Sequence, residues 1–185
     1  MHYKYMNIKL IIFLLNTITY YGSCLIFYFI DKYLIENSLW NKYKYQKYKG
    51  SNDFYKSKIF KVWFSSIKMS LINSFFSLIL IYISNFNTSL YEFSDIYKLP
   101  LYALYAESHF YFFHRLFHSK YLYFIHKKHH ETHITVAASA NNSNVLEHIL
   151  VNVGEIYVAN YLFQGSILLT LIVILFGTVN PILGH

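Results

Sequence analysis

Two long apolar segments near the start of the chain constrain its fold more than any other feature. The first runs from Ile8 to Ile30 with Lys9 as its only charge, and the second runs from Val62 to Ser84 with Lys68 as its only charge. Each is long enough to cross a hydrocarbon core of about 30 Å at about 1.5 Å per residue. The composition agrees, since 55% of the residues are hydrophobic and 21% are aromatic. We therefore expect an all-α membrane protein, because lipid cannot form hydrogen bonds with backbone N–H and C=O groups, and a helix pairs these groups internally.

A lysine-rich connector between these segments predicts their orientation. Residues 31–61 contain eight lysines and three acidic residues. Positively charged loops tend to stay in the cytosol, so we place this connector there. The same rule accounts for the net charge of +7, and we expect no nucleic-acid partner. The next polar stretch, residues 85–95, carries Glu92 and Asp95 without a lysine, as expected on the opposite side of the membrane.

Two further hydrophobic segments complete the expected topology. Ile96–Phe113 is short and broken near its start by Pro100, and its length permits either a tilted span or a re-entrant segment. We favour a crossing, because it returns the basic stretch that follows to the side of the lysine-rich connector. Ile149–Leu183 is interrupted at residues 164–166 by Gln-Gly-Ser, where we expect a hairpin turn. The prediction is a polytopic all-α membrane protein with about four hydrophobic segments.

Most of the polar chemistry lies in one stretch, ESHFYFFHRLFHSKYLYFIHKKHHETH (107–133), which holds seven of the ten histidines. His114 and His118 are spaced i and i+4, so a helix would place both imidazoles on one face. A second group is spaced i, i+3, i+4 and i+7 and would form another helical stripe. It consists of His126, His129, His130 and His133. Neutral imidazole is the commonest metal ligand, so this spacing predicts a metal site.

The alternative is a set of solvated histidines in a basic loop, because lysines flank the cluster at Lys127 and Lys128. Histidines beside lysines repel one another unless a bound cation keeps the imidazoles neutral, which favours ligation. A zinc protease fits less well because no HExxH occurs. A bis-histidine haem protein also fits less well, since the histidines crowd one stretch instead of facing each other from separate helices. Glu107 lies two helical turns before His114 on the same face, and its carboxylate could accept the second N–H of a ligating imidazole.

The histidine pattern resembles that of a known family. HRLFH (His114–His118) and HKKHH (His126–His130) are similar to the first two histidine boxes, HxxxH and HxxHH, of the fatty acid hydroxylase and sterol desaturase superfamily. The run FHRLFHSKYLYFIHKKHHETH looks most like the branch that contains sterol 4-methyl oxidases. The resemblance covers residues 107–185, and in that family a histidine occupies the position of His185 after the hairpin.

The resemblance implies a membrane-bound, non-haem di-iron oxidoreductase that uses O2 to hydroxylate, desaturate or demethylate a sterol or fatty acyl lipid in lipid biosynthesis. Its partners would be the lipid substrate, the bilayer and an electron-donor protein of cytochrome or flavoprotein type. Its location would be the endoplasmic reticulum, with the histidine cluster facing the cytosol. The implied iron ligands are His114, His118, His126, His129, His130 and His185, with His133 and Glu107 as additional or supporting groups. The resemblance does not identify a catalytic side chain.

One part of the family pattern is missing, because a third HxxHH box would lie downstream of His185, where the printed sequence ends. The five to seven histidines available could complete one metal site but would leave two under-coordinated. We divide the chain into an N-terminal transmembrane region with a basic cytosolic loop (1–95) and a histidine-box domain without its third box (96–185). Two interpretations stay open: a C-terminally incomplete oxidase, or a degenerate, non-catalytic membrane protein with a partial metal site.

Overall fold

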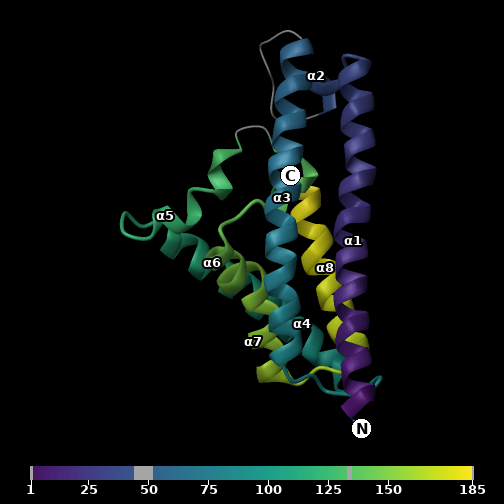
Figure 1. Cartoon of the computed structure of the whole chain (residues 1–185). Helices are drawn as coiled ribbons and strands as arrows, with labels where there is room; N and C mark the ends of the chain where they lie inside the picture. Colours follow the sequence, from purple (N-terminus) through teal and green to yellow (C-terminus); the bar gives the residue numbers. More distant parts are fainter. Residues whose placement is uncertain (1, 44–51, 133–134, 185) are drawn as a thin grey trace.

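The computed structural model describes residues 2–43, 52–132 and 135–184, and every regular element within these ranges is helical. The expected all-α fold is therefore confirmed. Three long helices dominate the structure (Figure 1): α1 (His2–Glu36), α3 (Asn52–Ile83) and α8 (Ile167–Gly184). Helix α1 packs against both of the others. All three are long and apolar enough to cross a membrane, as an integral membrane protein requires.

Helices α1 and α3 are longer than the apolar segments that predicted them. Helix α1 continues to Glu36 and α3 begins at Asn52, so both extend into the lysine-rich connector, which also contains the short helix α2 (Trp40–Tyr43). Lysine is a good helix former, and it favours this extension wherever its ammonium group reaches solvent. The apolar segments thus mark the membrane-length part of each helix and not its ends.

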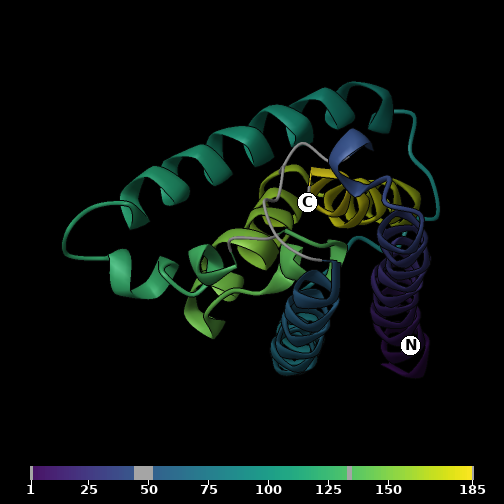
Figure 2. The ribbon, with the colours of Figure 1, turned by 90° about the horizontal axis from the view of Figure 1, so that it is seen from above.

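Helix α4 (Asp95–Phe117) is steeply tilted relative to the long helices. Seen from above, α1 and α3 appear nearly end-on, whereas α4 extends across one edge of the structure (Figure 2). It is not among the three helices that qualify as membrane spans. The predicted break at Pro100 is wrong, since the helix runs through this residue. Pro100 lies near the start of the helix, so its missing N–H deprives only the carbonyl of Ile96, in the first turn, of an intrahelical partner.

The start of α4 is attached to the turn between α7 (Gly154–Phe163) and α8. This turn confirms the predicted break at residues 164–166, and Gln164 has a left-handed backbone with φ of 49°. The hydroxyl of Ser166 donates to Asp95 Oδ2 at 2.5 Å, and Lys98 Nζ donates to the carbonyl oxygen of Gln164 at 3.0 Å. These bonds position α4 beside the α7–α8 hairpin.

A buried polar stripe on α3 faces a segment that lies inside the bundle without forming an α-helix. The stripe consists of Ser66, Ser70, Asn73 and Ser77, which are at most 6% exposed. Asn73 Nδ2 donates to the carbonyl oxygens of Asn141 at 3.1 Å and Ser143 at 3.2 Å. This bonding satisfies backbone groups that lipid would leave without partners.

The segment held by this stripe contains the 3-10 helix η2 (Ala137–Asn141). Residues 135–144 have small and mostly polar side chains, a composition typical of a surface loop, yet none of them is exposed. Residues 136–139 are at most 2% exposed, and η2 packs against α1, α3 and α8. The small side chains of this segment permit close packing. Its burial is supported by the hydrogen bonds from Asn73 and by the hydroxyl of Tyr20 on α1, which donates to the carbonyl oxygen of Ala138 at 3.0 Å.

Candidate metal centre

The C-terminal end of α4 presents the first two histidines of the site. His114 lies in the last turn of α4 and His118 is the residue that caps it, with its backbone N–H donating to the carbonyl oxygen of His114 at 3.1 Å. The helical spacing i and i+4 therefore brings both imidazoles to one face, as predicted. The chain then turns back through the short helix α5 (Tyr123–His126), which places His126 against the end of α4.

The chain beyond α5 does not form the single helical stripe that we predicted. Helix α5 ends at His126, and the 3-10 helix η1 (His129–Glu131) follows after Lys127 and Lys128. A 3-10 helix has about three residues per turn, so the change in helix type alters which side chains share a face. His130 joins the ligand cluster, whereas the ring of His129 stacks on that of His126 with 5.5 Å between centroids.

Four imidazoles converge at this point, from His114, His118, His126 and His130. One nitrogen from each lies within 4.8 Å of the other three. The Nε2 atoms of His114 and His118 are 3.2 Å apart, and those of His126 and His130 are 2.9 Å apart. Nitrogen ligands about 2.1 Å from a tetrahedral ion are separated by about 3.4 Å, so these donors fit one ion between them. Imidazole suits iron as well as zinc, copper and nickel, so the donor set fits iron without selecting it.

A buried carboxylate orients one of the four imidazoles. Glu147 ends the short helix α6 (Val145–Glu147), and its Oε1 lies 2.6 Å from Nδ1 of His126. Both residues are buried. In the tautomer with its proton on Nδ1, His126 donates this N–H to the carboxyl oxygen and keeps its lone pair on Nε2, which faces His130. Carboxylate–histidine pairs of this kind fix the tautomer and raise the basicity of metal ligands.

The sequence offered Glu107 as a candidate for this role, but the structure brings Glu147 and not Glu107 to an imidazole of the cluster. Glu107 is exposed on α4, and within the described residues no hydrogen bond joins it to any of the four imidazoles. The seven residues between Glu107 and His114 correspond to about 10 Å along a helix axis, which is beyond hydrogen-bond reach. The sequence did contain a signal for Glu147, since this acidic residue lies two positions before the long apolar run that begins at Ile149, and ionisable groups near membrane depth are functional candidates.

Burial keeps the clustered imidazoles in the form that binds metals. It lowers the pKa of His126 to about 3, helped by the neighbouring imidazoles, and it also lowers the pKa values of His114 and His130. These three rings are therefore neutral at pH 7 and have free lone pairs. Burial raises the pKa of Glu147 to about 8, and its Oε2 has no hydrogen-bond partner within the described structure. A cation beside His126 would favour the ionised carboxylate.

Comparison with known proteins identifies the region that carries this site. Residues 99–185 match the family model described as fatty acid hydroxylase, and this range contains all four converging histidines and Glu147. This match supports the assignment of this part of the chain to the fatty acid hydroxylase and sterol desaturase superfamily. The family indicates an oxidase that acts on lipids as a hydroxylase or desaturase. The match does not separate the sterol 4-methyl oxidase branch from the others. No curated protein and no solved structure matches the chain.

The other described histidines of the fatty acid hydroxylase domain lie outside the four-donor group. His109 bonds the Tyr105 hydroxyl at 3.0 Å and donates to the carbonyl oxygen of Leu150 at 2.8 Å, which ties α4 to the π-helical turn η3 (His148–Val153). His133 and His185 lie outside the described residues. Whether the α7–α8 hairpin returns His185 to the cluster therefore stays a prediction.

The histidine that begins η3, His148, lies inside the helical bundle. It is only 3% exposed, and its Nε2 lies 2.8 Å from the hydroxyl oxygen of Ser77 on the polar stripe of α3. Burial lowers the pKa of His148 to about 4. The π-helical turn carries this side chain into the bundle, where the serine supplies a hydrogen-bond partner that the local sequence does not reveal.

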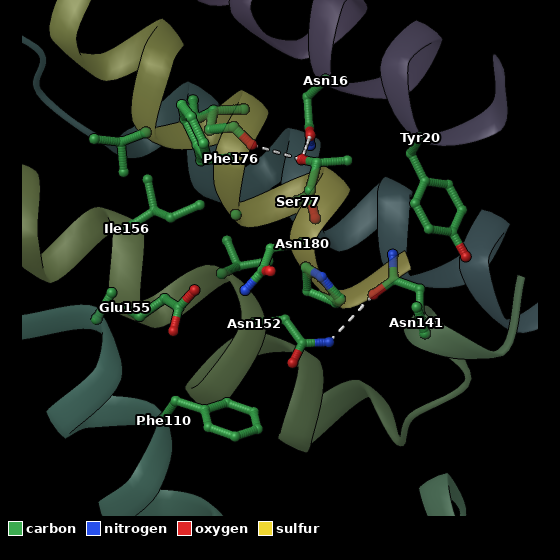
Figure 3. A pocket seen from close by; sticks show the side chains of 18 of the residues that line it. Asn16, Tyr20, Ser77, Phe110, Asn141, Asn152, Glu155, Ile156, Phe176 and Asn180 are labelled. Carbon is green, nitrogen blue, oxygen red and sulfur yellow. Dashed lines mark hydrogen bonds between the residues drawn. The ribbon is translucent and has the colours of Figure 1, made fainter. Parts of the chain in front are cut away.

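A cavity of about 1060 Å³ extends from the histidine cluster into the interior of the fatty acid hydroxylase domain and the N-terminal helices. His114 and His129 line it beside the cluster. In the close-up of Figure 3, side chains from several helices surround the central space, among them Asn152, Glu155 and Asn180. The cavity therefore adjoins His114, one of the four donors, and its volume could accommodate a small molecule.

Proposed function

We propose that this chain is a membrane-bound, iron-dependent oxidoreductase that uses O2 to hydroxylate, desaturate or demethylate a lipid. The observation that carries the proposal is the convergence of four imidazole donors within 4.8 Å, beside a cavity that membrane-length helices help to line. The fatty acid hydroxylase match supports it. When bound, iron supplies the O2 and one-electron chemistry needed to break an unactivated C–H bond, which no side chain provides.

The residues of the chain have distinct roles in this proposal. His114, His118, His126 and His130 hold iron through neutral imidazole nitrogens, and Glu147 orients His126. A second iron ion requires further donors. The candidates are His129, which lines the cavity beside the cluster, and His133 and His185, which the sequence pattern nominated.

The proposed placement follows the charge pattern of the chain. Helix α4 rises from the end of the structure that holds the N-terminus toward the end that holds α2 (Figure 1). Its histidine end is therefore directed toward the side of the lysine-rich connector, which we place in the cytosol. We propose the endoplasmic reticulum as the membrane and a cytochrome or flavoprotein as the electron donor.

Two lysines beside the cluster differ in their suitability for docking that donor. Lys127 is exposed and available to an acidic surface, whereas Lys128 already pairs with Glu131 at 2.7 Å. Complementary charge mainly accelerates encounter, so Lys127 would affect the rate of electron delivery more than the chemistry.

One observation favours a second candidate function. Within the described residues only four donors converge, which is the number that completes one tetrahedral ion. A non-catalytic membrane protein with a single structural metal would need no more than this set.

Metal content and turnover together test the proposal. The full chain would be purified in detergent, reconstituted anaerobically with Fe(II), and assayed for bound iron by mass spectrometry and for O2-dependent lipid oxidation with a reductase system. We expect iron binding and oxidation in the wild type, loss of both in His126→Ala, and retention of iron in His109→Gln as the matched control. Bound iron without oxidation would support the second candidate, and absence of bound iron would contradict both.

A further inference from the structure

The end of α4 and the turn that follows it project from the bundle. In both views this part of the chain extends away from α1, α3 and α8 (Figures 1 and 2). We call residues 111–124, which hold the last turns of α4 and the start of α5, the projecting tip. Its inner side packs against η3 through an apolar cluster. The members of this cluster are Phe113, Phe117, Leu122, Ile125 and Val151. The inner side therefore has its partner within the chain, and the outer side faces away from it.

The outer side of the projecting tip exposes large aromatic rings. Tyr121 is 84% exposed and Phe124 is 66% exposed. Three more aromatic side chains of the tip are also exposed: Tyr111, Phe112 and Tyr123. Exposed apolar side chains that gather in one part of a protein mark a surface that contacts a partner or a membrane. The outer side therefore requires surroundings that accept apolar rings.

The permanent charges of the tip are all positive. Arg115 and Lys120 are exposed, and residues 111–124 contain no acidic residue. The acidic residues nearest in the chain are engaged elsewhere, since Glu107 lines the cavity and Glu131 pairs with a lysine at 2.7 Å. A metal ion in the four-histidine cluster would add further positive charge. Aromatic rings together with cations are the composition of segments that lie among lipid headgroups.

The length and tilt of α4 limit how far the tip rises. Helix α4 has 23 residues, which corresponds to a length of about 35 Å. It starts on the side opposite to the lysine-rich connector and is tilted, so it rises by less than its length. The hydrocarbon core and its two polar layers together measure about 40–45 Å. A tilted helix that starts at one headgroup layer therefore does not carry its far end beyond the opposite one.

The exposed side chains along α4 change in the order that this placement requires. Tyr97 is exposed near the start, Leu101 and Leu104 are exposed in the middle, and Tyr111 and Arg115 are exposed near the end. Aliphatic side chains suit hydrocarbon, whereas tyrosine and basic residues are enriched at the two membrane–water interfaces. The order of the exposed residues thus indicates an interface at each end of α4.

We propose that the projecting tip lies in the headgroup layer of the bilayer, on the side of the lysine-rich connector. Its aromatic rings lie below the phosphates of the phospholipids, and Arg115 and Lys120 bind those phosphates. Because the tip carries His114 and His118, this contact holds the four-histidine cluster at the membrane surface. The inference depends on the membrane-length helices and the tip, and it does not depend on the proposed oxidase function.

A fluorescent probe on introduced cysteines measures the depth of the tip. The full chain carrying Tyr121→Cys or Phe124→Cys is labelled with bimane and reconstituted in vesicles of phosphatidylcholine and phosphatidylglycerol. The native Cys24 is only 1% exposed, so labelling is confined to the introduced thiol. We expect a nitroxide on the lipid headgroup to quench both probes at least about twofold more than a nitroxide near the end of the acyl chain, because the tip lies at the interface.

Two further positions calibrate this measurement. Phe75 is 59% exposed on α3, within the apolar span, so a probe at Phe75→Cys should be quenched more by the deep nitroxide. Tyr43 is 61% exposed on α2, in the lysine-rich connector, so a probe at Tyr43→Cys should be quenched by iodide in the buffer and not by either lipid.

Charge substitutions test the contact with phosphates. At low salt, spin-labelled phosphatidylglycerol should quench the probe at Phe124→Cys at least about fivefold more than spin-labelled phosphatidylcholine, because one basic residue near a membrane surface attracts anionic lipid by about this factor. Combining Arg115→Gln with Lys120→Gln should lower this ratio to about one. The matched control is Lys42→Gln with Lys61→Gln, which removes two exposed cations outside the tip and should leave the ratio unchanged.

The alternative surroundings of the tip give different results. Quenching of the tip probes by iodide alone would place the tip in water and overturn the inference. Stronger quenching by the deep nitroxide would place it in hydrocarbon and also overturn it. Protection from iodide and lipid in vesicles, lost in nanodiscs that hold one chain each, would assign the tip to contact between copies instead. Equal effects of the two double substitutions would refute the assignment of Arg115 and Lys120 as phosphate contacts.

Discussion

Replacing Glu147 with leucine should weaken metal binding without removing a metal ligand. The Oε1 atom of Glu147 accepts the Nδ1–H of His126 at 2.6 Å, and His126 is only 1% exposed. Leucine cannot accept this bond, and a buried N–H without a partner costs about 1–3 kcal/mol. Loss of such a partner from a ligating histidine typically reduces metal affinity about 10–100-fold, which is about 1.4–2.8 kcal/mol. We therefore expect the Kd for Fe(II) to rise about 10–100-fold in Glu147→Leu.

A chelator competition titration under anaerobic conditions would measure this change. Glu147→Gln keeps an amide oxygen that can accept from His126, so its Kd should rise less than about tenfold. Glu107→Leu is the matched control, because Glu107 is exposed and forms no hydrogen bond to the four imidazoles of the described site. Thermal unfolding of the metal-free proteins would verify that each variant is folded.

The leucine variant should retain the fold for an electrostatic reason. Burial raises the pKa of Glu147 to about 8, so without a metal this carboxyl group is mostly uncharged at pH 7. Leucine then replaces a neutral buried group and not a charge. Wild-type affinity in Glu147→Leu, or an equal loss in Glu107→Leu, would refute the assignment of Glu147 as the orienting carboxylate.

Three further predictions concern other parts of the structure. Removing His118 should abolish stoichiometric metal binding, whereas His129→Ala should retain at least one ion, and metal analysis of the two proteins distinguishes them. Asp95→Ala removes the acceptor of the Ser166 hydroxyl and should destabilise the protein by about 2–3 kcal/mol, seen as a lower thermal midpoint. The pKa of His148 falls from about 6.5 when unfolded to about 4 when folded, so the unfolded chain binds more protons between these values and stability decreases as the pH falls through this window. The loss totals about 3 kcal/mol and should be absent in His148→Gln, and equal acid sensitivity in both proteins would contradict it.

Local patterns in the sequence predicted the helical elements and part of the site well. Apolar length indicated the membrane-length helices, and the Gln-Gly-Ser interruption predicted the turn at residues 164–166. The i and i+4 spacing of His114 and His118 predicted a pair of imidazoles on one helix face, and the two Nε2 atoms lie 3.2 Å apart. These features depend on neighbours within one or two helical turns, which the sequence displays directly.

Features that depend on distant partners could not be read in the same way. The second histidine group changes from α-helix to 3-10 helix after His126, and its contacts with the end of α4 select His130 and not His129 for the cluster. Glu147 reaches His126 across 21 positions of the chain. The buried position of His148 depends on a serine 71 positions away.

The sequence by itself therefore determined that this is an all-α membrane protein with a histidine cluster near the end of one helix that could hold a metal ion. Hydrophobic length and helical periodicity are sufficient for both conclusions. Tertiary structure alone decided which four imidazoles converge, which carboxylate orients them, and which side chains line the adjoining cavity. The physical reason is that hydrogen bonding and burial depend on atoms brought together from separate elements, and only the packed arrangement of helices specifies those partners.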